Sequence, residues 1–232
     1  RHGQMCIRAR PIGLIPLLPR LWCRARKHAT TEWERANHHS FLYAGKGMGA
    51  NVAACKQAAR AELAATATFR IGYAQALPDL VKALDRIPHW LIVQEERGLG
   101  YPLWFIKLSL ETYKLTRVIR IQAVVSHEVV AYRGITAGSG SACTEMKLVM
   151  IRIVLRASEA HPTIVPCCFV DDLSAEGAGT NDHVDTELGE FIVVVAVGIT
   201  EGGMELSGTK CVATASNKTL GKRLQDRWTK AG

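Results

Sequence analysis

Residues 164–177 read IVPCCFVDDLSAEG, and this stretch decides the fold because an apolar run delivers two neighbouring carboxylates. Residues 164–170 have the length and composition of a buried strand. Asp171 and Asp172 follow side by side, and adjacent carboxylates repel each other unless a positive group lies between them. The sequence therefore predicts a strand that ends in a turn, with both aspartates at its tip.

Two explanations of this pair are open. A divalent cation such as Mg²⁺ prefers hard oxygen ligands and would neutralise both carboxylates. An Asp-Asp pair is also a common polar turn without any ligand. A calcium loop is excluded, since Leu173 and Ser174 occupy the positions where its second ligand would stand.

The composition is that of a globular chain with a basic surplus. Of 232 residues, 48% are hydrophobic and 22% charged, which argues against disorder. The chain is long enough for one large domain or a domain with a smaller lobe. Its net charge of +8 favours a polyanionic partner, most simply nucleic acid, although many basic proteins have no such partner.

The seven cysteines and the apolar runs bear on the compartment. No two cysteines have C-x-x-C spacing, so neither a disulfide framework nor a zinc site is predicted. Cys167 and Cys168 should point to opposite faces of their strand as small buried residues. The longest apolar run, residues 191–199, is too short to span a bilayer, and residues 1–10 do not form a signal peptide. We expect an intracellular protein with no membrane partner, in either nucleus or cytoplasm.

The order of the expected elements favours an α+β fold. Prolines within residues 8–20 predict extended or turning chain before the first helix. The last residues, 224–232, offer no obvious closing element. Helices are expected over residues 21–38, 51–69, 79–98 (after a turn), 101–114 and 182–197, with another running to residue 160 from a cap near Ser139 or Ser141; a hairpin is expected over 116–134, the strand over 164–170, and a strand pair or strand and turn over 203–216.

Five short motifs follow one another along the chain. Together they resemble, in identity and order, the motifs of reverse transcriptases, particularly those of non-LTR retrotransposons and group II introns. The most specific is DLVKALDRIPH. The motifs are RPIGLIP (10–16), DLVKALDRIPH (79–89), RGITAGSG (133–140), FVDD (169–172) and LSGTK (206–210).

The resemblance implies nucleotidyl transfer with two metal ions, Mg²⁺ or, as an alternative, Mn²⁺. The matching metal ligands are the carboxylates of Asp79 and Asp171. Asp172 would be a weaker or structural ligand. The backbone carbonyl of Leu80 would be an additional donor.

The resemblance also implies residues around the nucleotide. Lys210 is a candidate proton donor to pyrophosphate, with a solvated surface lysine as the equal alternative. Arg10 would contact the triphosphate. The loop with Ala137 and Gly138 would pack beneath the templating base and the incoming nucleotide, and Leu84 would lie near the ribose.

Arginines outside the motifs have two explanations as well. Arg117 and Arg120, on the expected hairpin, could contact a nucleic-acid phosphate, yet exposed arginines on strands are ordinary. His89 ends the DLVKALDRIPH motif. We expect it to be a packing or hydrogen-bonding residue at a helix start rather than a base.

The chain departs from the family pattern at three positions. Leu84 replaces an aromatic residue that blocks a ribose 2′-hydroxyl, and Ala137 replaces a glutamine near the nucleotide. Pro78 precedes Asp79 and cannot donate to a central strand ladder. The stretch YAQALP (73–78) is also a poor strand by propensity.

The resemblance implies an α+β polymerase fold, with an antiparallel palm sheet under packed helices and a helical or irregular fingers region. We assign residues 1–70 to a fingers-like region, 71–215 to the palm, and 216–232 to the start of a connection to a largely absent thumb. The expected function is a reverse transcriptase fragment that uses an RNA template, a DNA primer and deoxynucleoside triphosphates. The alternatives are an inactive, basic nucleic-acid-binding relic of a retroelement, and an unrelated α+β protein with a polar turn.

Overall fold

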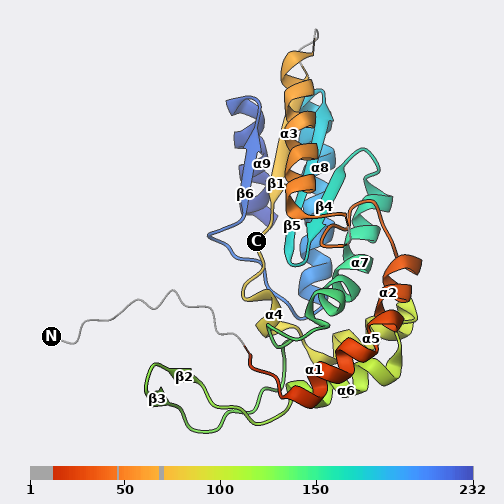
Figure 1. The fold of residues 1–232 in the computed structure, drawn as a ribbon. Coiled ribbons are helices and arrows are strands. Elements are labelled where there is room, and N and C mark those ends of the chain that lie inside the picture. Colours follow the sequence, from red (N-terminus) through yellow and green to blue (C-terminus); the bar gives the residue numbers. More distant parts are fainter. Residues whose placement is uncertain (1–12, 46, 68–70, 232) are drawn as a thin grey trace, which may run out of the picture.

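The structure is a computed structural model that describes residues 13–45, 47–67 and 71–231. Within these residues an antiparallel sheet of four strands forms the centre of the molecule (Figure 1). In spatial order the strands are β4 (Val165–Phe169), β5 (Asp172–Gly179), β1 (Gly72–Leu77) and β6 (Val212–Ala215). β4 and β5 form a hairpin, and β1 lies between β5 and β6.

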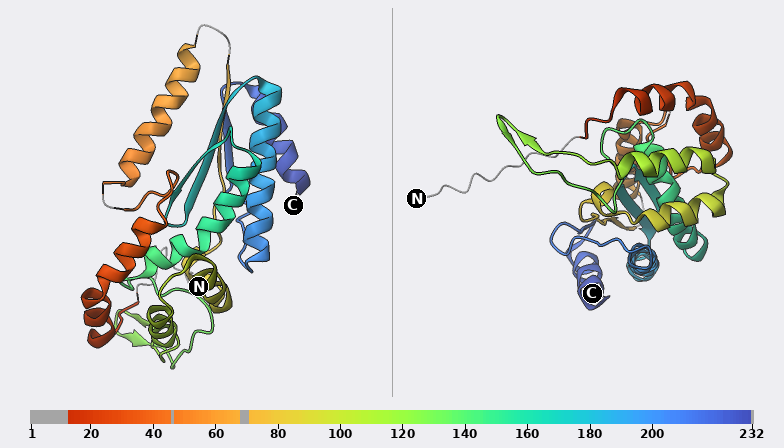
Figure 2. Two further views of the ribbon diagram at one scale, coloured as in Figure 1. Left: turned by 90° about the vertical axis from the view of Figure 1, so that its right-hand side faces the viewer. Right: turned by 90° about the horizontal axis from the view of Figure 1, so that it is seen from below.

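Helices cover both faces of the sheet, as Figure 2 shows. α3 (Ala50–Thr66) lies over one face. α7 (Ala142–Ala160), α8 (Asn181–Glu201) and α9 (Lys218–Ala231) lie over the other. An antiparallel sheet with packed helices agrees with the expected α+β class at this coarse level.

The remaining elements gather at one end of the sheet (Figure 1). These elements are α1 (Leu17–Ala25), α2 (Lys27–Ala36), α4 (Ala83–Arg86), α5 (His89–Leu99), α6 (Leu103–Tyr113) and the short hairpin of β2 (Arg120–Ile121) and β3 (Val124–Val125).

In the part of the chain that the structure describes, no helix has both the length and the apolar composition needed to cross a membrane.

The β4–β5 hairpin contains the two neighbouring cysteines. Cys168 belongs to the main hydrophobic core, whereas Cys167 packs in a small cluster with Tyr43 and Ala53 on the other face. The prediction that the two cysteines point to opposite faces is confirmed. Strand alternation therefore gives one hairpin two apolar faces.

The central strand β1 corrects the expectation that YAQALP is a poor strand. Ala74 and Ala76 are fully buried, and small side chains are what allow helices to approach this strand. Pro78 comes after Leu77, the last residue of β1 that is paired with β6, so its missing N–H removes no ladder bond. Tertiary packing has overridden propensity here.

The first helix also begins earlier than predicted. α1 starts at Leu17 with Pro16 at its N-cap, and Pro19 falls in the first turn. Proline is tolerated there because the first amide groups of a helix have no intrahelical partner. The expected helix over 21–38 is in fact two helices, because the backbone departs from helical geometry at Arg26.

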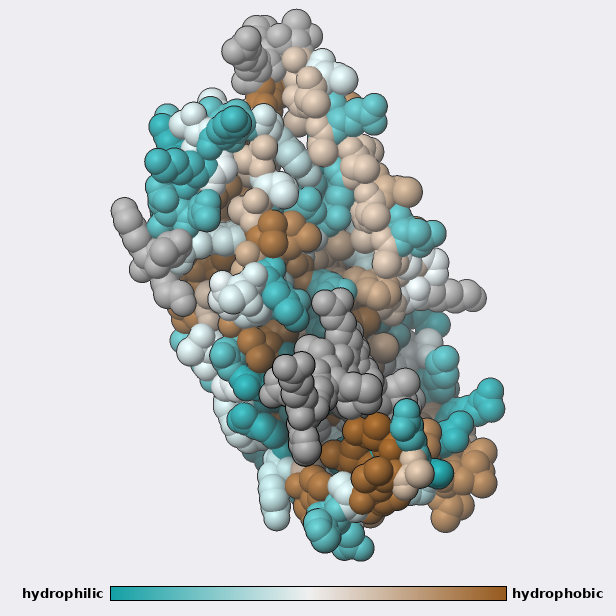
Figure 3. Space-filling model, turned by 90° about the vertical axis from the view of Figure 1, so that its left-hand side faces the viewer, coloured by the Kyte–Doolittle hydropathy of each residue, from teal (hydrophilic) through white to brown (hydrophobic). Residues whose placement is uncertain are grey.

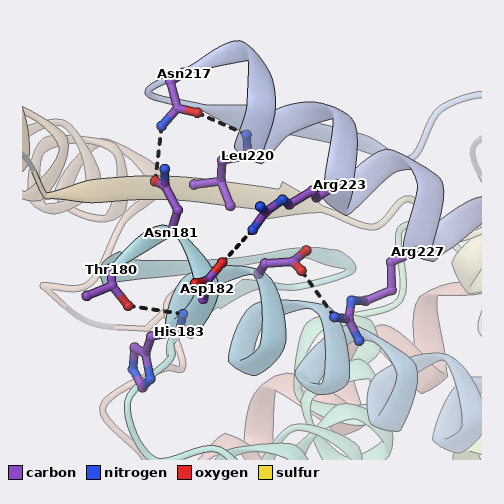
Figure 4. Close-up of polar contacts among 9 residues, drawn as sticks. Thr180, Asn181, Asp182, His183, Asn217, Leu220, Arg223 and Arg227 are labelled. Atoms are coloured by element: carbon purple, nitrogen blue, oxygen red, sulfur yellow. Dashed lines mark hydrogen bonds and ion pairs between the residues drawn. The ribbon is translucent and has the colours of Figure 1, made fainter.

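The C-terminal segment closes onto the sheet, although no closing element was expected there. Leu220 and Leu224 of α9 are fully buried against the core. Polar contacts fasten α9 to α8 (Figure 4). These are Asn217 Nδ2 to Asn181 Oδ1 (3.1 Å), Arg223 Nη1 to Asp182 Oδ1 (2.5 Å) and Arg227 Nη2 to Asp185 Oδ2 (3.2 Å).

Candidate active site

Strand pairing brings the predicted catalytic carboxylates to one edge of the sheet. β1 and β5 run antiparallel, with register from Gly72 opposite Gly179 to Ala76 opposite Ala175. The end of β1 and the start of β5 therefore share an edge. Asp79 lies two residues beyond β1, Asp172 opens β5, and Asp171 lies in the turn before it.

Lys210 reaches the same edge from the other neighbour of β1. Leu77 is opposite Val212 of β6, so the residues just outside these two strands lie side by side. Lys210 Nζ is 3.8 Å from Asp79 Oδ2. Their side chains are 72% and 38% exposed, so this ion pair adds little to stability.

The backbone of Asp79 is held on both sides. Its N–H donates to Cys211 Sγ at 3.3 Å, and its carbonyl accepts from the Ser207 N–H at 2.7 Å. Leu80 is buried and bridges to Leu206. The sequence pointed to LSGTK but not to Cys211, which follows that motif directly. The role of the Leu80 carbonyl as a metal ligand stays a prediction.

The hairpin tip has an unusual backbone. Val170 has φ of +60°, which a β-branched residue rarely adopts, and Phe169 pairs with Asp172 to close the turn. The Cys168 thiol donates to the Val170 carbonyl at 3.5 Å. Burial, followed by the charges of Cys167 and the two aspartates, raises the pKa of Cys168 to about 12. Such backbone outliers gather at functional sites.

The donor types at this edge suit a hard divalent cation, because carboxylate oxygens predominate. Their arrangement is not yet that of a metal site. Across the described ranges, no group of three or more His, Cys, Asp or Glu side chains is placed to hold a metal ion. The Asp79 carboxylate instead lies beside Lys210. Metal binding by Asp79, Leu80, Asp171 and Asp172 therefore stays a prediction.

The RGITAGSG loop is tied to α4 and α5. The Gly134 N–H donates to the Ile87 carbonyl at 2.7 Å, and His89 Nε2 lies 3.0 Å from the Gly134 carbonyl. A Cβ at Gly134, where φ is +94°, would lie 2.6 Å from the Asp85 carbonyl oxygen, so only glycine fits. The expected role of His89, hydrogen bonding at a helix start, is confirmed.

The predicted nucleotide-binding residues lie on segments that contact one another. The Leu84 carbonyl accepts from the Ile135 N–H at 2.6 Å, and the half-buried Leu84 side chain packs against the core. Ala137 is half-buried, and Gly138 is exposed with φ of +100°. Arg10 lies outside the described residues. Nucleotide binding by these four residues stays a prediction.

A buried polar network that the sequence did not reveal lies beneath this loop. The Tyr113 hydroxyl donates to Glu145 Oε2 at 2.5 Å, and Ser139 and Ser141 lie within hydrogen-bonding distance of each other and of Tyr113. Burial raises the pKa of Glu145, which is fully enclosed in the first turn of α7. The available signal was a glutamate in the first turn of a helix whose following residues are mostly apolar.

The two hairpin arginines differ in their surroundings. Arg117 is half-buried and donates to the Tyr113 carbonyl and to Thr136 Oγ1, so it braces the loop. Arg120 is exposed and donates to the Gln122 carbonyl at 3.0 Å. Nucleic-acid binding by either stays a prediction.

Hydrophobic side chains gather near this hairpin and α1, at the lower end of the face in Figure 3. They point to solvent rather than to the core. Those that are at least half exposed include Leu14, Leu17, Leu18 and Leu21 on the α1 side and Val118, Ile119, Ile121, Val124 and Val125 on the hairpin.

Comparisons with known proteins bear on the fold. No protein-family model matches the chain. No curated protein matches it either. Solved structures do match, and among them are telomerases.

Three telomerase structures from Candida tropicalis are similar to this chain. The complex with a TWJ fragment of telomeric RNA has 11% identity and a TM-score of 0.59, over 83% of this chain and 33% of that one. The apo enzyme has 10% identity and a TM-score of 0.57, over 84% and 36%. The apo enzyme truncated from its C-terminal domain has 12% identity and a TM-score of 0.55, over 84% and 40%.

At such low identity the likeness shows the fold alone. The telomerase catalytic subunit contains a reverse-transcriptase-like fold, and this chain shares that fold at a coarse level. The chain spans a third to two fifths of the length of these structures.

Proposed function

We propose that this chain is the fingers and palm part of a reverse transcriptase of the retrotransposon or group II intron type. It would extend a DNA primer with deoxynucleoside triphosphates on an RNA template. The observation that carries the proposal is the position of Asp79, Asp171 and Asp172 at one edge of the sheet. The coarse fold likeness to telomerase supports it.

The carboxylates would act by holding divalent metal. Mg²⁺ or Mn²⁺, when bound, would activate the primer hydroxyl and neutralise the triphosphate. Asp79 and Asp171 would hold the ions from separate strands, with the Leu80 carbonyl as a further ligand. Asp172 would support them at the start of β5. Convergence from two strands fixes the positions that in-line transfer requires.

Lys210 would act on the leaving group. Its ammonium group lies 3.8 Å from the Asp79 carboxylate. From this position it would turn toward the leaving pyrophosphate and donate a proton to it. Its side chain is 72% exposed, so a change of rotamer meets little packing resistance.

Residues of the neighbouring segments would form the nucleotide pocket. Leu84 would lie near the ribose, Ala137 and Gly138 near the base pair, and Arg10 near the triphosphate. Leucine presents a smaller barrier to a 2′-hydroxyl than an aromatic ring does. We therefore expect weak discrimination between deoxy- and ribonucleotides.

Primer extension on an RNA template tests the proposal. The assay compares the native chain with Asp79→Asn and Asp171→Asn, in Mg²⁺ and in Mn²⁺, and offers deoxy- and ribonucleotides separately. Each variant should lower extension by at least about a hundredfold, because each removes a charge that acts on the transition state. Asp226→Asn, an exposed aspartate on α9, is the matched control and should extend normally. Unchanged extension by Asp171→Asn would contradict the proposal.

An inactive nucleic-acid-binding relic is the second candidate. Leu84 and Ala137, at positions where the chain departs from the family pattern, favour it. It predicts RNA binding that weakens with salt and no incorporation with either metal. An unrelated α+β protein would show neither binding nor incorporation.

A further inference from the structure

A cavity of about 450 Å³ is lined by residues of α5, α7 and the C-terminal end of α8. None of the described residues that line it belongs to the candidate active site. Gly198 of α8 and Gly202, the C-cap of that helix, lie in its wall. A Cβ at Gly198 would lie 3.1 Å from Ile153, and one at Gly202 would lie 3.0 Å from Leu91. These glycines let α8 approach α5 and α7 closely around the cavity.

The cavity has more negative than positive groups. Arg152 Nη1 is 3.5 Å from Glu95 Oε1, and Arg156 Nη1 is 2.9 Å from Glu201 Oε2. Glu159 adds a third carboxylate to the lining. This acidic balance is opposite in sign to the chain's net charge of +8. The lining therefore disfavours phosphate and favours a cation.

Glu95 gives the cavity wall a buried and poorly compensated carboxylate. Its side chain is 6% exposed, and its Oε2 atom is buried without a hydrogen-bond partner. Its other oxygen has only the long contact to Arg152, a side chain that is 52% exposed. A buried carboxylate with so little compensation is costly, and the charge of a cation in the cavity beside Glu95 would offset part of that cost.

An aromatic face completes the arrangement. Trp90 lies in the first turn of α5, lines the cavity and is 52% exposed. Indole is the aromatic group that attracts cations most strongly. We propose that this cavity binds an organic cation, a guanidinium or primary ammonium group, held by the Glu95 carboxylate together with Trp90 and Glu159. The proposal does not depend on polymerase activity.

Calorimetric titration of the full chain at low salt tests this site. The probe is N-acetyl-arginine amide, and N-acetyl-citrulline amide is the neutral control of the same shape. Saturable binding of the arginine compound alone is expected. Glu95→Gln should weaken it about tenfold and Trp90→Ala about threefold. Glu190→Gln, an exposed glutamate of α8 outside the lining, should leave it unchanged.

Several outcomes would overturn the proposal. These are equal binding of the citrulline compound, no saturable binding, or equal losses in Glu95→Gln and Glu190→Gln. If circular dichroism shows that Glu95→Gln is unfolded, Trp90→Ala and Glu159→Gln carry the test, because both side chains are exposed. A titration with spermidine distinguishes two sources of the bound cation, a free polyamine and a basic side chain of a partner protein. Tighter binding of spermidine would support a free polyamine as the ligand, and tighter binding of the arginine compound a basic side chain of a partner protein.

Discussion

Burial separates the carboxylates of this chain into two kinds. Asp79 and Asp171 are partly exposed at the sheet edge, where water and ligands reach them. Glu145 is fully enclosed beneath the RGITAGSG loop, and burial raises its pKa. The first kind is open to ligands from solvent, whereas Glu145 is bonded to the buried Tyr113 hydroxyl.

Glu145 makes the stability of the fold depend on pH. Because its pKa in the folded state is above the ordinary value of 4.5, the folded state keeps a proton that the unfolded state releases. Its contribution is complete below that ordinary value and falls as the pH rises toward the folded pKa. Glutamine does not titrate, so Glu145→Gln removes this loss of stability with rising pH. The free energy of unfolding of the variant, relative to the native chain, should therefore increase between pH 4 and neutral pH.

Urea unfolding at a series of pH values measures this difference. Glu62→Gln, an exposed glutamate of α3, is the control, and its difference from the native chain should stay nearly constant. A constant difference for Glu145→Gln as well would show that Glu145 does not have a raised pKa.

The cysteines should differ in reactivity according to burial. Cys168 has a pKa of about 12, so its reactive thiolate is scarce at pH 8. Cys55 and Cys143 are exposed. Maleimide at pH 8, followed by peptide mass spectrometry, should label Cys55 and Cys143 fully while Cys168 reacts only in denaturant. Labelling of Cys168 at the rate of Cys55 would contradict the buried position of β4.

Among the elements, the sequence predicted helices better than strands. Residues 101–114 and 134–160 carry helical periodicity, and α6 and α7 lie inside those ranges. The strand β5 was not predicted, because DLSAEGAG lacks β-branched residues. A Cβ at Gly177 would lie 2.8 Å from Ile164 Cδ1, so a larger residue here would displace the buried Ile164 side chain. Such packing is not visible in a local pattern.

The candidate site was predictable only in part. The motifs named Asp79, Asp171 and Lys210, and the sheet register brings them together. The contacts of Cys211 and Tyr113 were not predictable, because each joins residues far apart in the sequence.

A buried ion pair fastens α3 to the sheet. Arg60 Nε donates to Glu176 Oε1 at 2.6 Å, and Tyr73 donates to the other oxygen at 2.6 Å. Glu176 is 2% exposed. Arg60→Met would leave this carboxylate without its cation and should lower the free energy of unfolding by about 2 kcal/mol. Hydrogen exchange should then rise along α3.

The control for α3 is an exposed ion pair. Arg223→Gln removes the partner of Asp182, whose side chain is 88% exposed, and should cost less than about 0.5 kcal/mol. Equal costs for both variants in urea unfolding would mean that Glu176 is not buried by α3.

The helix α9 contributes to the core. Leu224 is fully buried, so Leu224→Ala should lower the free energy of unfolding by about 3 kcal/mol. Leu63→Ala is the matched control, since Leu63 is 70% exposed on α3 and its truncation should cost less than about 0.5 kcal/mol. Urea denaturation measures both. A small cost at Leu224 would indicate that α9 is detached in solution.

At the scale of the whole molecule, charge distinguishes the surfaces. The chain has a net charge of +8, whereas the cavity between α5, α7 and α8 has more carboxylates than guanidinium groups. A polyanion and an organic cation would therefore bind different parts of the molecule. Binding of the polyanion should not depend on the carboxylates that hold the organic cation, and binding of the organic cation should not depend on the basic residues that hold the polyanion.

The basic surplus leads to a prediction about RNA. Binding of a single-stranded RNA releases counterions, so raising the salt from 50 to 200 mM should weaken it at least about tenfold in fluorescence anisotropy. Arg120→Gln, on the exposed hairpin, should weaken binding and flatten the salt dependence, whereas Glu95→Gln in the cavity should change neither. Salt-independent binding, or none, would contradict both the polymerase and the relic. Salt-dependent binding without primer extension would favour the relic. Phosphate contacts need only surface charge, whereas the proposed nucleotidyl transfer would also require Asp79 and Asp171 to share metal.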